Sequence, residues 1–403
     1  MTILGVIGIL LSFAGLFFAS ARPSQGRAIF AIVLILLHIG ASIAYYIYAQ
    51  SNPSDAFLYY YDAYMMRNHD FQFGTIFLIK FVQALKTVFG GSYLDYFLLF
   101  QVFGIWGILL VFRTFQEIHD HLGQRPSQIS YVLLLFPGLH FWTSALGKDA
   151  PIFFAVSLAV WAAIKLRTRL FPFMIAVGLM MLMRPHIALV ATISMAAAAF
   201  FDNRFNTLAK AALLVVAIVG ASYIALTVKT TFSVDVTDAN SISDFFATQQ
   251  QKAQTQTGGT MIRDASYGVR LFSLLFRPLF IDANGVFALI ASVENLFTLF
   301  LFGFMLRNWK ELGWLARRVF FLRFSLIFAV AIVLLLTLVA FNGGIGSRQK
   351  SMAYPAFFAF FVSQWAFHRA QQWAQRRALH PQAASFGPPT PAALGPARMS
   401  TPE

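Results

Sequence analysis

The chain has 403 residues, of which 58% are hydrophobic and only 11% are charged, and its mean hydropathy is +0.67. This apolar surface exceeds what one water-soluble core can bury, which excludes an ordinary soluble protein and predicts a polytopic membrane protein. The absence of cysteine excludes disulfides, thiolate metal sites and thiol catalysis. A net charge of +14 would indicate nucleic acid binding in a soluble protein, but here the basic clusters mostly mark the cytoplasmic ends of apolar runs.

The apolar runs and their flanking charges predict an all-α transmembrane bundle of about eleven spans with outward-facing polar hinges. The first run, 2–20, ends like a signal-peptidase site but lacks a basic leader, so we expect an uncleaved span with its N-terminus outside. The second run, 28–49, returns to the outside. An external segment at about 50–92 follows, and its apolar stretch at 77–89 is short enough to be an interfacial helix.

Two short hairpins come after the run at 93–112. They join 130–141 to 152–164 and 171–183 to 187–201, and the basic residues beyond each pair place both hinges outside.

The run at 208–228 leads out to a long external loop at about 229–285. Three final spans, 286–306, 319–341 and 352–367, bring the C-terminus to the cytoplasm. We therefore expect one transmembrane catalytic domain at 1–368 and a disordered cytoplasmic tail at 369–403.

The first hinge, FPGLHFWTSALGKDAP at 136–151, carries Lys148 and Asp149 between two apolar runs. An ionisable pair at such a place predicts a functional site. Pro151 suits the first turn of a helix, whose free amides would form an anion site with Lys148. Asp149 has two further interpretations, as a helix cap or as a neutralising partner of Lys148.

Basic residues precede a proline at four places near the outer ends of inward-running segments. A helix N-terminus is partially positive, so each place combines a dipole end with a cation and would attract phosphate or pyrophosphate. The alternative is that these side chains reach lipid phosphates, although short flanking segments place Arg184 below the surface. The residues are Lys148 before Pro151, Arg184 before Pro185, Arg277 before Pro278, and Arg348 with Lys350 before Pro355.

Acidic and histidine side chains are predicted on the same side. Asp55 and Asp62 would share a helix face, where a carboxylate could act as general base; Asp55 could equally be a helix cap, and for Asp62 a structural role is favoured. His186 and His140 could transfer a proton or hold a phosphate oxygen, although structural roles are more frequent. Glu294 is a buried acid whose expected partner is an outer arginine. No metal-ligand spacing, Walker loop or nucleophile elbow occurs.

These features resemble the polytopic bacterial enzymes that build surface glycans on polyprenyl carriers. The families are the O-antigen and exopolysaccharide polymerases and the related GT-C type glycosyltransferases. The resemblance rests on residues 54–61, 136–149, 184–186, 277–278, 294–295 and 343–348.

The resemblance implies a sugar donor on a polyprenyl phosphate or pyrophosphate, bound at the periplasmic face of the inner membrane. Asp55 would be the base, and Arg184 and Arg348 the phosphate ligands. The chain departs from GT-C transferases because it lacks an acidic pair in the first loop and a soluble C-terminal domain. This moves the expectation toward the polymerases; no cofactor is expected, and a divalent metal is not indicated.

Glycosyl transfer to a glycan acceptor is therefore the expected function, with the lipid bilayer as a partner and no nucleic acid. Asp55 or His186 would activate the acceptor hydroxyl, and Lys148, Arg184, Arg277 and Arg348 would stabilise the leaving phosphate, with Lys350 as a further phosphate ligand. A transporter or flippase of an anionic lipid-linked substrate is the competing class, because paired short hairpins also occur in transporters. A non-catalytic assembly subunit is a third. The one-sided placement of the exceptional charges favours chemistry.

Overall fold

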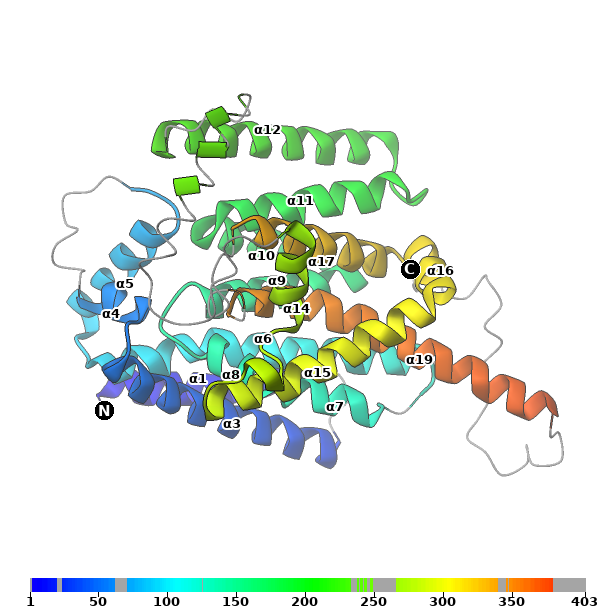
Figure 1. The fold of residues 1–403 in the computed structure, drawn as a ribbon, viewed down its shortest axis with the longest axis horizontal. Helices are drawn as coiled ribbons and strands as arrows, with labels where there is room; N and C mark the ends of the chain where they lie inside the picture. Colours follow the sequence, from blue (N-terminus) through cyan, green and yellow to red (C-terminus); the bar gives the residue numbers. More distant parts are fainter. Residues whose placement is uncertain are drawn as a thin grey trace.

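The computed structural model describes residues 2–19, 24–61, 71–124, 126–232, 266–339 and 348–379, together with 346 and a few positions between 238 and 248. Every regular element within these residues is a helix, which confirms the predicted all-α class. The helices pack around one large cluster of buried apolar residues (Figure 1). The predicted tail lies outside the described residues from position 380 onward.

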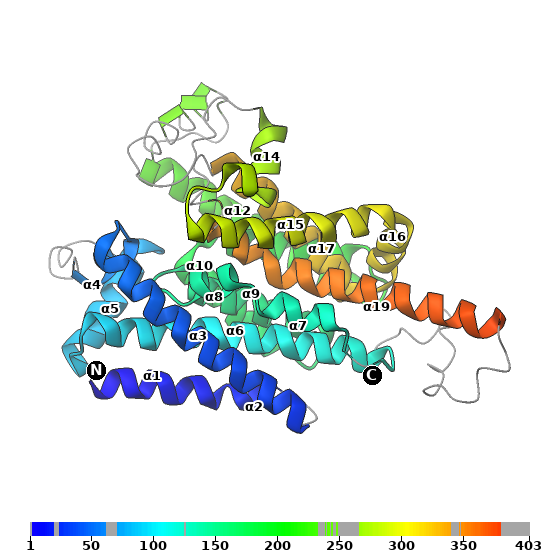
Figure 2. The same ribbon diagram turned by 60° about the horizontal axis from the view of Figure 1, so that its bottom comes forward.

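The N-terminal helices lie along α6, as Figure 2 shows at the lower edge of the bundle. A Cβ at Gly8 would lie 2.3 Å from the carbonyl oxygen of Leu98, so glycine allows the close crossing of α1 and α6. Two short helices, α4 and α5, cover one end of this layer, and α5 contains the short apolar stretch at 77–89. The elements are α1 (Ile3–Ala14), α2 (Leu16–Ala19), α3 (Gln25–Ser51), α4 (Asp55–Tyr61), α5 (Thr75–Phe89) and α6 (Tyr93–His121).

The middle of the chain forms α7 (Gln128–Leu134), α8 (Pro137–Thr143), α9 (Asp149–Ile164), α10 (Leu170–Met183), α11 (Pro185–Phe200) and α12 (Thr207–Phe232). The second predicted hinge is confirmed, because α10 ends at Met183 and α11 begins at Pro185. Proline at the first helical position loses no hydrogen bond there, which explains the new start. Arg184 is the single residue between the two helices.

The first hinge differs from the expectation. Residues 137–143 form the separate helix α8, and α9 begins at Asp149, two residues before Pro151. The amide of Ile152 donates to the carbonyl oxygen of Lys148 at 3.1 Å. The free amides of this helix start therefore precede Pro151, at Lys148, Asp149 and Ala150, instead of following it.

The C-terminal helices cover α9 and α11 from the other side. α15 and α17 have the predicted bounds to within two residues, whereas the last helix continues to Leu379 instead of ending at 367. α17 packs against both α11 and α19. The elements are α14 (Tyr267–Phe276), η1 (Phe280–Asp282), α15 (Val286–Arg307), α16 (Trp309–Arg318), α17 (Phe320–Val339), η2 (Lys350–Ala353) and α19 (Tyr354–Leu379).

Four of the described helices are long and apolar enough to cross a membrane. They are Gln25–Ser51, Tyr93–His121, Val286–Arg307 and Phe320–Leu338. Six other apolar helices among the described residues are only 10–17 residues long. The apolar helices indicate a membrane protein, while the predicted total of about eleven spans is not confirmed.

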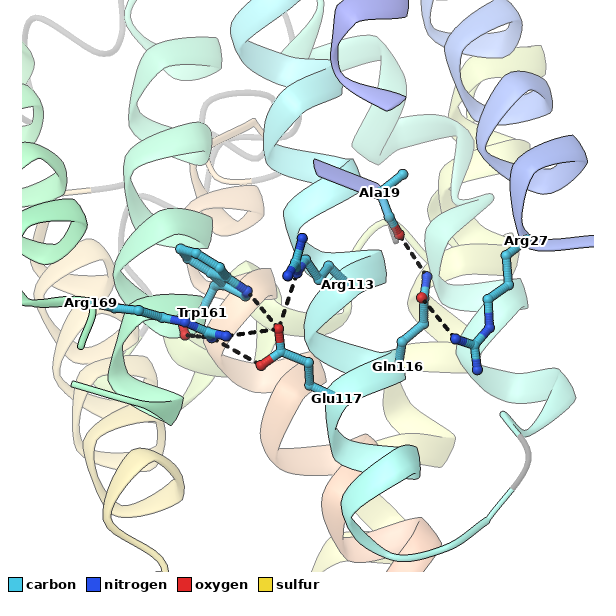
Figure 3. Close-up of polar contacts among 7 residues, drawn as sticks. All are labelled: Ala19, Arg27, Arg113, Gln116, Glu117, Trp161 and Arg169. Carbon is cyan, nitrogen blue, oxygen red and sulfur yellow. Dashed lines mark hydrogen bonds and ion pairs between the residues drawn. The ribbon is translucent and has the colours of Figure 1, made fainter. Parts of the chain in front are cut away.

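A polar cluster joins α6 to the end of α9 (Figure 3). Glu117 accepts hydrogen bonds from Arg113 at 3.1 Å, from Arg169 at 2.9 Å and from the indole of Trp161 at 3.1 Å. The guanidinium of Arg169 also lies 3.9 Å from the centre of the Trp161 ring. Beside it, Gln116 binds the carbonyl of Ala19 and the side chain of Arg27. These contacts hold α2, α3, α6 and α9 together at this end of the bundle. The predicted site lies at the other end of α9, about 24 Å away along the helix.

Candidate functional site

Asp149, the first residue of α9, lies at the centre of a cluster of charged side chains. One carboxylate oxygen accepts a hydrogen bond from Arg184 Nη2 at 2.7 Å, and the other pairs with Nε of Arg348. The side chain of Asp149 is 3% exposed and that of Arg184 is 10% exposed. The hinge before α11 and the segment before η2 thus meet at one buried carboxylate. Asp149 therefore binds two arginines, and it neither caps its helix nor pairs with Lys148.

Arg348 links this buried carboxylate to a more exposed one. Its Nη1 lies 2.7 Å from Oδ2 of Asp55, whose side chain is 54% exposed. Burial by itself would lower the pKa of Arg348, but the charges of Asp149 and Asp55 raise that pKa well above its usual value. Arg348 therefore stays charged, and Oδ1 of Asp55 has no hydrogen-bond partner among the described residues.

Asp55 does not use its carboxylate as a helix cap. It is the first residue of α4, and the hydroxyl of Ser54 accepts the amide of Ala56 at 3.3 Å instead. The cap alternative for Asp55 is thus replaced by an ion pair with Arg348. Asp62, the second acid of the predicted face, lies outside the described residues.

Lys148 lies beside the cluster and donates to the hydroxyl of Thr75 at 3.0 Å. Burial and the neighbouring charge of Arg184 lower the pKa of Lys148 to about 8. Lys148, Arg184 and Arg348 with Asp149 and Asp55 make three positive and two negative groups, a net charge of +1. The cluster as a whole therefore favours an anion.

Two further nitrogen groups face the same region without a protein partner in the described part of the chain. Nε of Arg184 is buried and makes no hydrogen bond. His186, one residue beyond Pro185, is exposed and lies within electrostatic range of Arg184 and Lys148. A buried donor without an acceptor costs free energy, so a ligand with oxygen acceptors would be stabilised here.

A hollow of about 680 Å³ opens between the end of α3 and α4, and its wall includes Ser54, the residue before Asp55. Its wall combines amides and hydroxyls with aromatic rings, and the rings of Phe57 and Tyr61 lie 4.3 Å apart. This volume lies in the range of small-ligand sites. The lining residues are Ala49, Gln50, Ser51, Asn52, Pro53, Ser54, Phe57, Leu58 and Tyr61.

Lys350 and Glu294 occupy a second, more buried place. Lys350 is 6% exposed and its amine pairs with Oδ1 of Asn295. Glu294 accepts the amide of Gly138 at 2.6 Å, at the start of α8. The expectation that Glu294 pairs with an outer arginine is therefore wrong, because a helix N-terminus supplies the donor. Both side chains hold α15 to its neighbours, and Lys350 is too enclosed to serve as the predicted phosphate ligand.

His140 and Arg277 also lie in other surroundings than predicted. His140 is 1% exposed, with Nδ1 at 3.2 Å from Nδ1 of His38 and Nε2 at 2.8 Å from the carbonyl oxygen of Leu134. Arg277 pairs with Asp282 of η1, five residues later. The structure thus brings together Asp55, Lys148, Asp149, Arg184, His186 and Arg348 and leaves His140, Arg277, Glu294 and Lys350 outside this group.

Sequence reasoning missed Thr75 and Tyr59. Thr75 begins α5 and binds Lys148, and the ring of Tyr59, 2% exposed, would lie 3.6 Å from a Cβ at Gly147. Neither residue is charged or belongs to a recognisable motif. A tyrosine among the aromatic residues of 54–61 is also what ordinary helix packing would produce. Their roles follow only from the folding of α4 and α5 against the first hinge.

Comparison of the chain with family models, curated proteins and solved structures gives no match.

Proposed function

We propose that the chain is a glycosyl transfer enzyme that uses a sugar donor linked to a polyprenyl phosphate or pyrophosphate. The observation that carries this proposal is the pair of arginines held by the buried Asp149 next to the half-exposed Asp55. Such an arrangement offers preorganised cations for a phosphate and a carboxylate base beside them.

The donor phosphate would bind at Lys148, Arg184 and His186. Guanidinium groups suit phosphate oxygens because several N–H donors lie in one plane. Asp149 does not touch the substrate in this scheme; it positions Arg184 and Arg348. Charge neutralisation of the leaving phosphate would supply most of the catalysis.

The acceptor glycan would lie in the hollow beside Asp55. The apolar faces of a sugar ring match exposed aromatic rings such as Phe57 and Tyr61, and its hydroxyls match amide side chains such as Gln50. Oδ1 of Asp55 is then the free acceptor for the hydroxyl proton.

The reaction is a substitution at the anomeric carbon. The acceptor hydroxyl loses its proton to Asp55, its oxygen bonds to the anomeric carbon, and the bond from that carbon to the phosphate oxygen breaks. The electron pair of the broken bond leaves with the lipid phosphate, whose charge the basic side chains stabilise. We place this chemistry at the periplasmic face of a bacterial inner membrane, with the N-terminus periplasmic and the C-terminus cytoplasmic.

The test is mass spectrometry of the lipid-linked glycans in a strain that lacks the protein, compared with the complemented strain. Accumulation of complete single repeat units on the carrier would identify a polymerase, and accumulation of a unit short by one sugar would identify a transferase. Complete units confined to the cytoplasmic leaflet would contradict the proposal and identify a flippase. Complementation with Arg348→Ala should fail although the variant inserts at the normal level.

A further inference from the structure

The helix α16 connects α15 to α17 at one end of the bundle (Figure 2). One of its sides is packed: Leu315 is 1% exposed, and the ring of Trp314 stacks on that of Phe367 at 4.9 Å. This side lies against α17 and α19. The helix is therefore fixed to the bundle along one side and exposed along the other.

The exposed side of α16 is basic. Lys310 and Arg317 are seven residues apart and share a helix face, and Arg318 follows; all three are exposed. The one acid of the helix, Glu311, is engaged by Nδ1 of His368 at 2.7 Å. Arg307, at the end of α15, adds another exposed cation. The exposed side of α16 and the end of α15 thus present four cations, and the one acid of α16 is already bound to His368.

Exposed apolar side chains flank these cations. Trp309 is 63% exposed and Leu306 is 68% exposed, and both adjoin the start of α16. A half-buried amphipathic helix with a tryptophan and several basic residues is typical of segments that lie in the headgroup region of a membrane.

The C-terminus of α16 is held in place by Arg323 of α17. Its guanidinium donates to the carbonyl oxygens of Ala316 at 2.9 Å and Arg317, and to that of Ala198 in α11 at 3.0 Å. These bonds satisfy carbonyl groups that the end of a helix leaves free. They also attach α16 to the end of α11 that lies about 24 Å from Arg184, so α16 is remote from the candidate site.

We infer that α16 lies flat on the membrane surface and that its basic side binds the phosphate headgroups of anionic lipids. The packed side and the Arg323 contacts keep the helix rigid, so the cations are already placed when lipid arrives. Trp309 and Leu306 enter the region of the headgroups, while Lys310, Arg317 and Arg318 meet the phosphates. This inference does not depend on the proposed function.

The experiment is native mass spectrometry of the purified full chain in detergent, titrated with phosphatidylglycerol or with phosphatidylcholine. We expect the wild type to bind phosphatidylglycerol more tightly than phosphatidylcholine. The double variant Arg317→Gln/Arg318→Gln should bind it roughly fivefold more weakly for each charge removed. Arg317→Lys/Arg318→Lys should keep the preference, because an ammonium group also pairs with a lipid phosphate.

The matched control is Lys165→Gln/Arg167→Gln, which removes two exposed cations after the end of α9. It should keep the preference for phosphatidylglycerol. Equal losses of phosphatidylglycerol binding in both double variants would overturn the inference. So would a wild type that binds both lipids equally, and in that case an acidic protein segment would be the better partner for the basic side. Size-exclusion profiles of all variants report whether a loss comes from misfolding.

Discussion

Nη1 of Arg348 lies 2.7 Å from a carboxylate oxygen of Asp55, although 293 positions separate the two residues in the chain. The same guanidinium pairs with Asp149, which Arg184 also binds. One arginine therefore connects a buried structural carboxylate to a half-exposed one. This relationship makes the roles of the two acids separable by experiment.

Asp149→Asn should strongly destabilise the protein, because it leaves the buried Arg184 without a compensating charge and Arg348 with Asp55 alone. Removing one partner of a buried ion pair costs about 3–5 kcal/mol. Thermal unfolding of the purified protein in detergent would measure the loss. Asp282→Asn is the matched control, since the pair of Arg277 and Asp282 is more exposed and should contribute only about 0–1 kcal/mol. Equal stability of Asp149→Asn and wild type would contradict the positioning role.

Asp55→Asn should lower kcat of glycosyl transfer by roughly 10²- to 10⁴-fold with little change in donor affinity, because a general base acts in the transition state. Transfer from isolated lipid-linked donor would be followed in detergent or nanodiscs. Asp282→Asn is the control, because it makes the same change at a carboxylate that pairs with Arg277 outside the site. If Asp55→Asn changed only the donor affinity, Asp55 would instead be a residue that positions the phosphate-binding side chains.

Donor binding should depend on pH through Lys148, whose pKa is lowered to about 8 by burial and by the charge of Arg184. Below pH 8 the amine is charged and attracts phosphate; as the pH rises through 8 it loses its proton and the attraction. We expect the donor affinity to fall about tenfold between pH 7 and 9, the contribution of a charged hydrogen bond. Lys148→Arg stays charged over this range and should flatten the profile; an unchanged profile would exclude Lys148 from the site.

Gly104→Ala should destabilise the packing of α6 against the first hinge. A Cβ there would lie 2.0 Å from the backbone carbonyl oxygen of Thr143 and 2.5 Å from Nε2 of His38, and backbone cannot rotate away. Overpacking of this kind costs about 1–3 kcal/mol. Gly178→Ala in α10, where the added Cβ meets no atom within 4 Å, should instead be neutral or slightly stabilising. The thermal unfolding midpoints of the two variants check this difference. Similar shifts of the midpoint would contradict the close contact between Gly104 and Thr143.

The helical class, the bounds of α15 and α17, and the break at Arg184 could all be predicted from the sequence. These features depend on neighbours in the chain: the length of an apolar run, and a proline that can begin a helix but not continue one. The sequence also identified most of the charged residues that meet at the start of α9, because cations at the predicted outer ends of apolar runs are unusual. It did not predict their partners.

The tertiary structure alone decided which charge pairs with which. Asp149 binds two arginines instead of capping its helix, Glu294 binds the amide of Gly138 instead of an arginine, and His140 faces His38. It also divided the predicted first hinge, through the separate helix α8. The physical reason is that a buried polar group must find a partner within about 3 Å, and only the packing of helices distant in sequence sets which groups come that close.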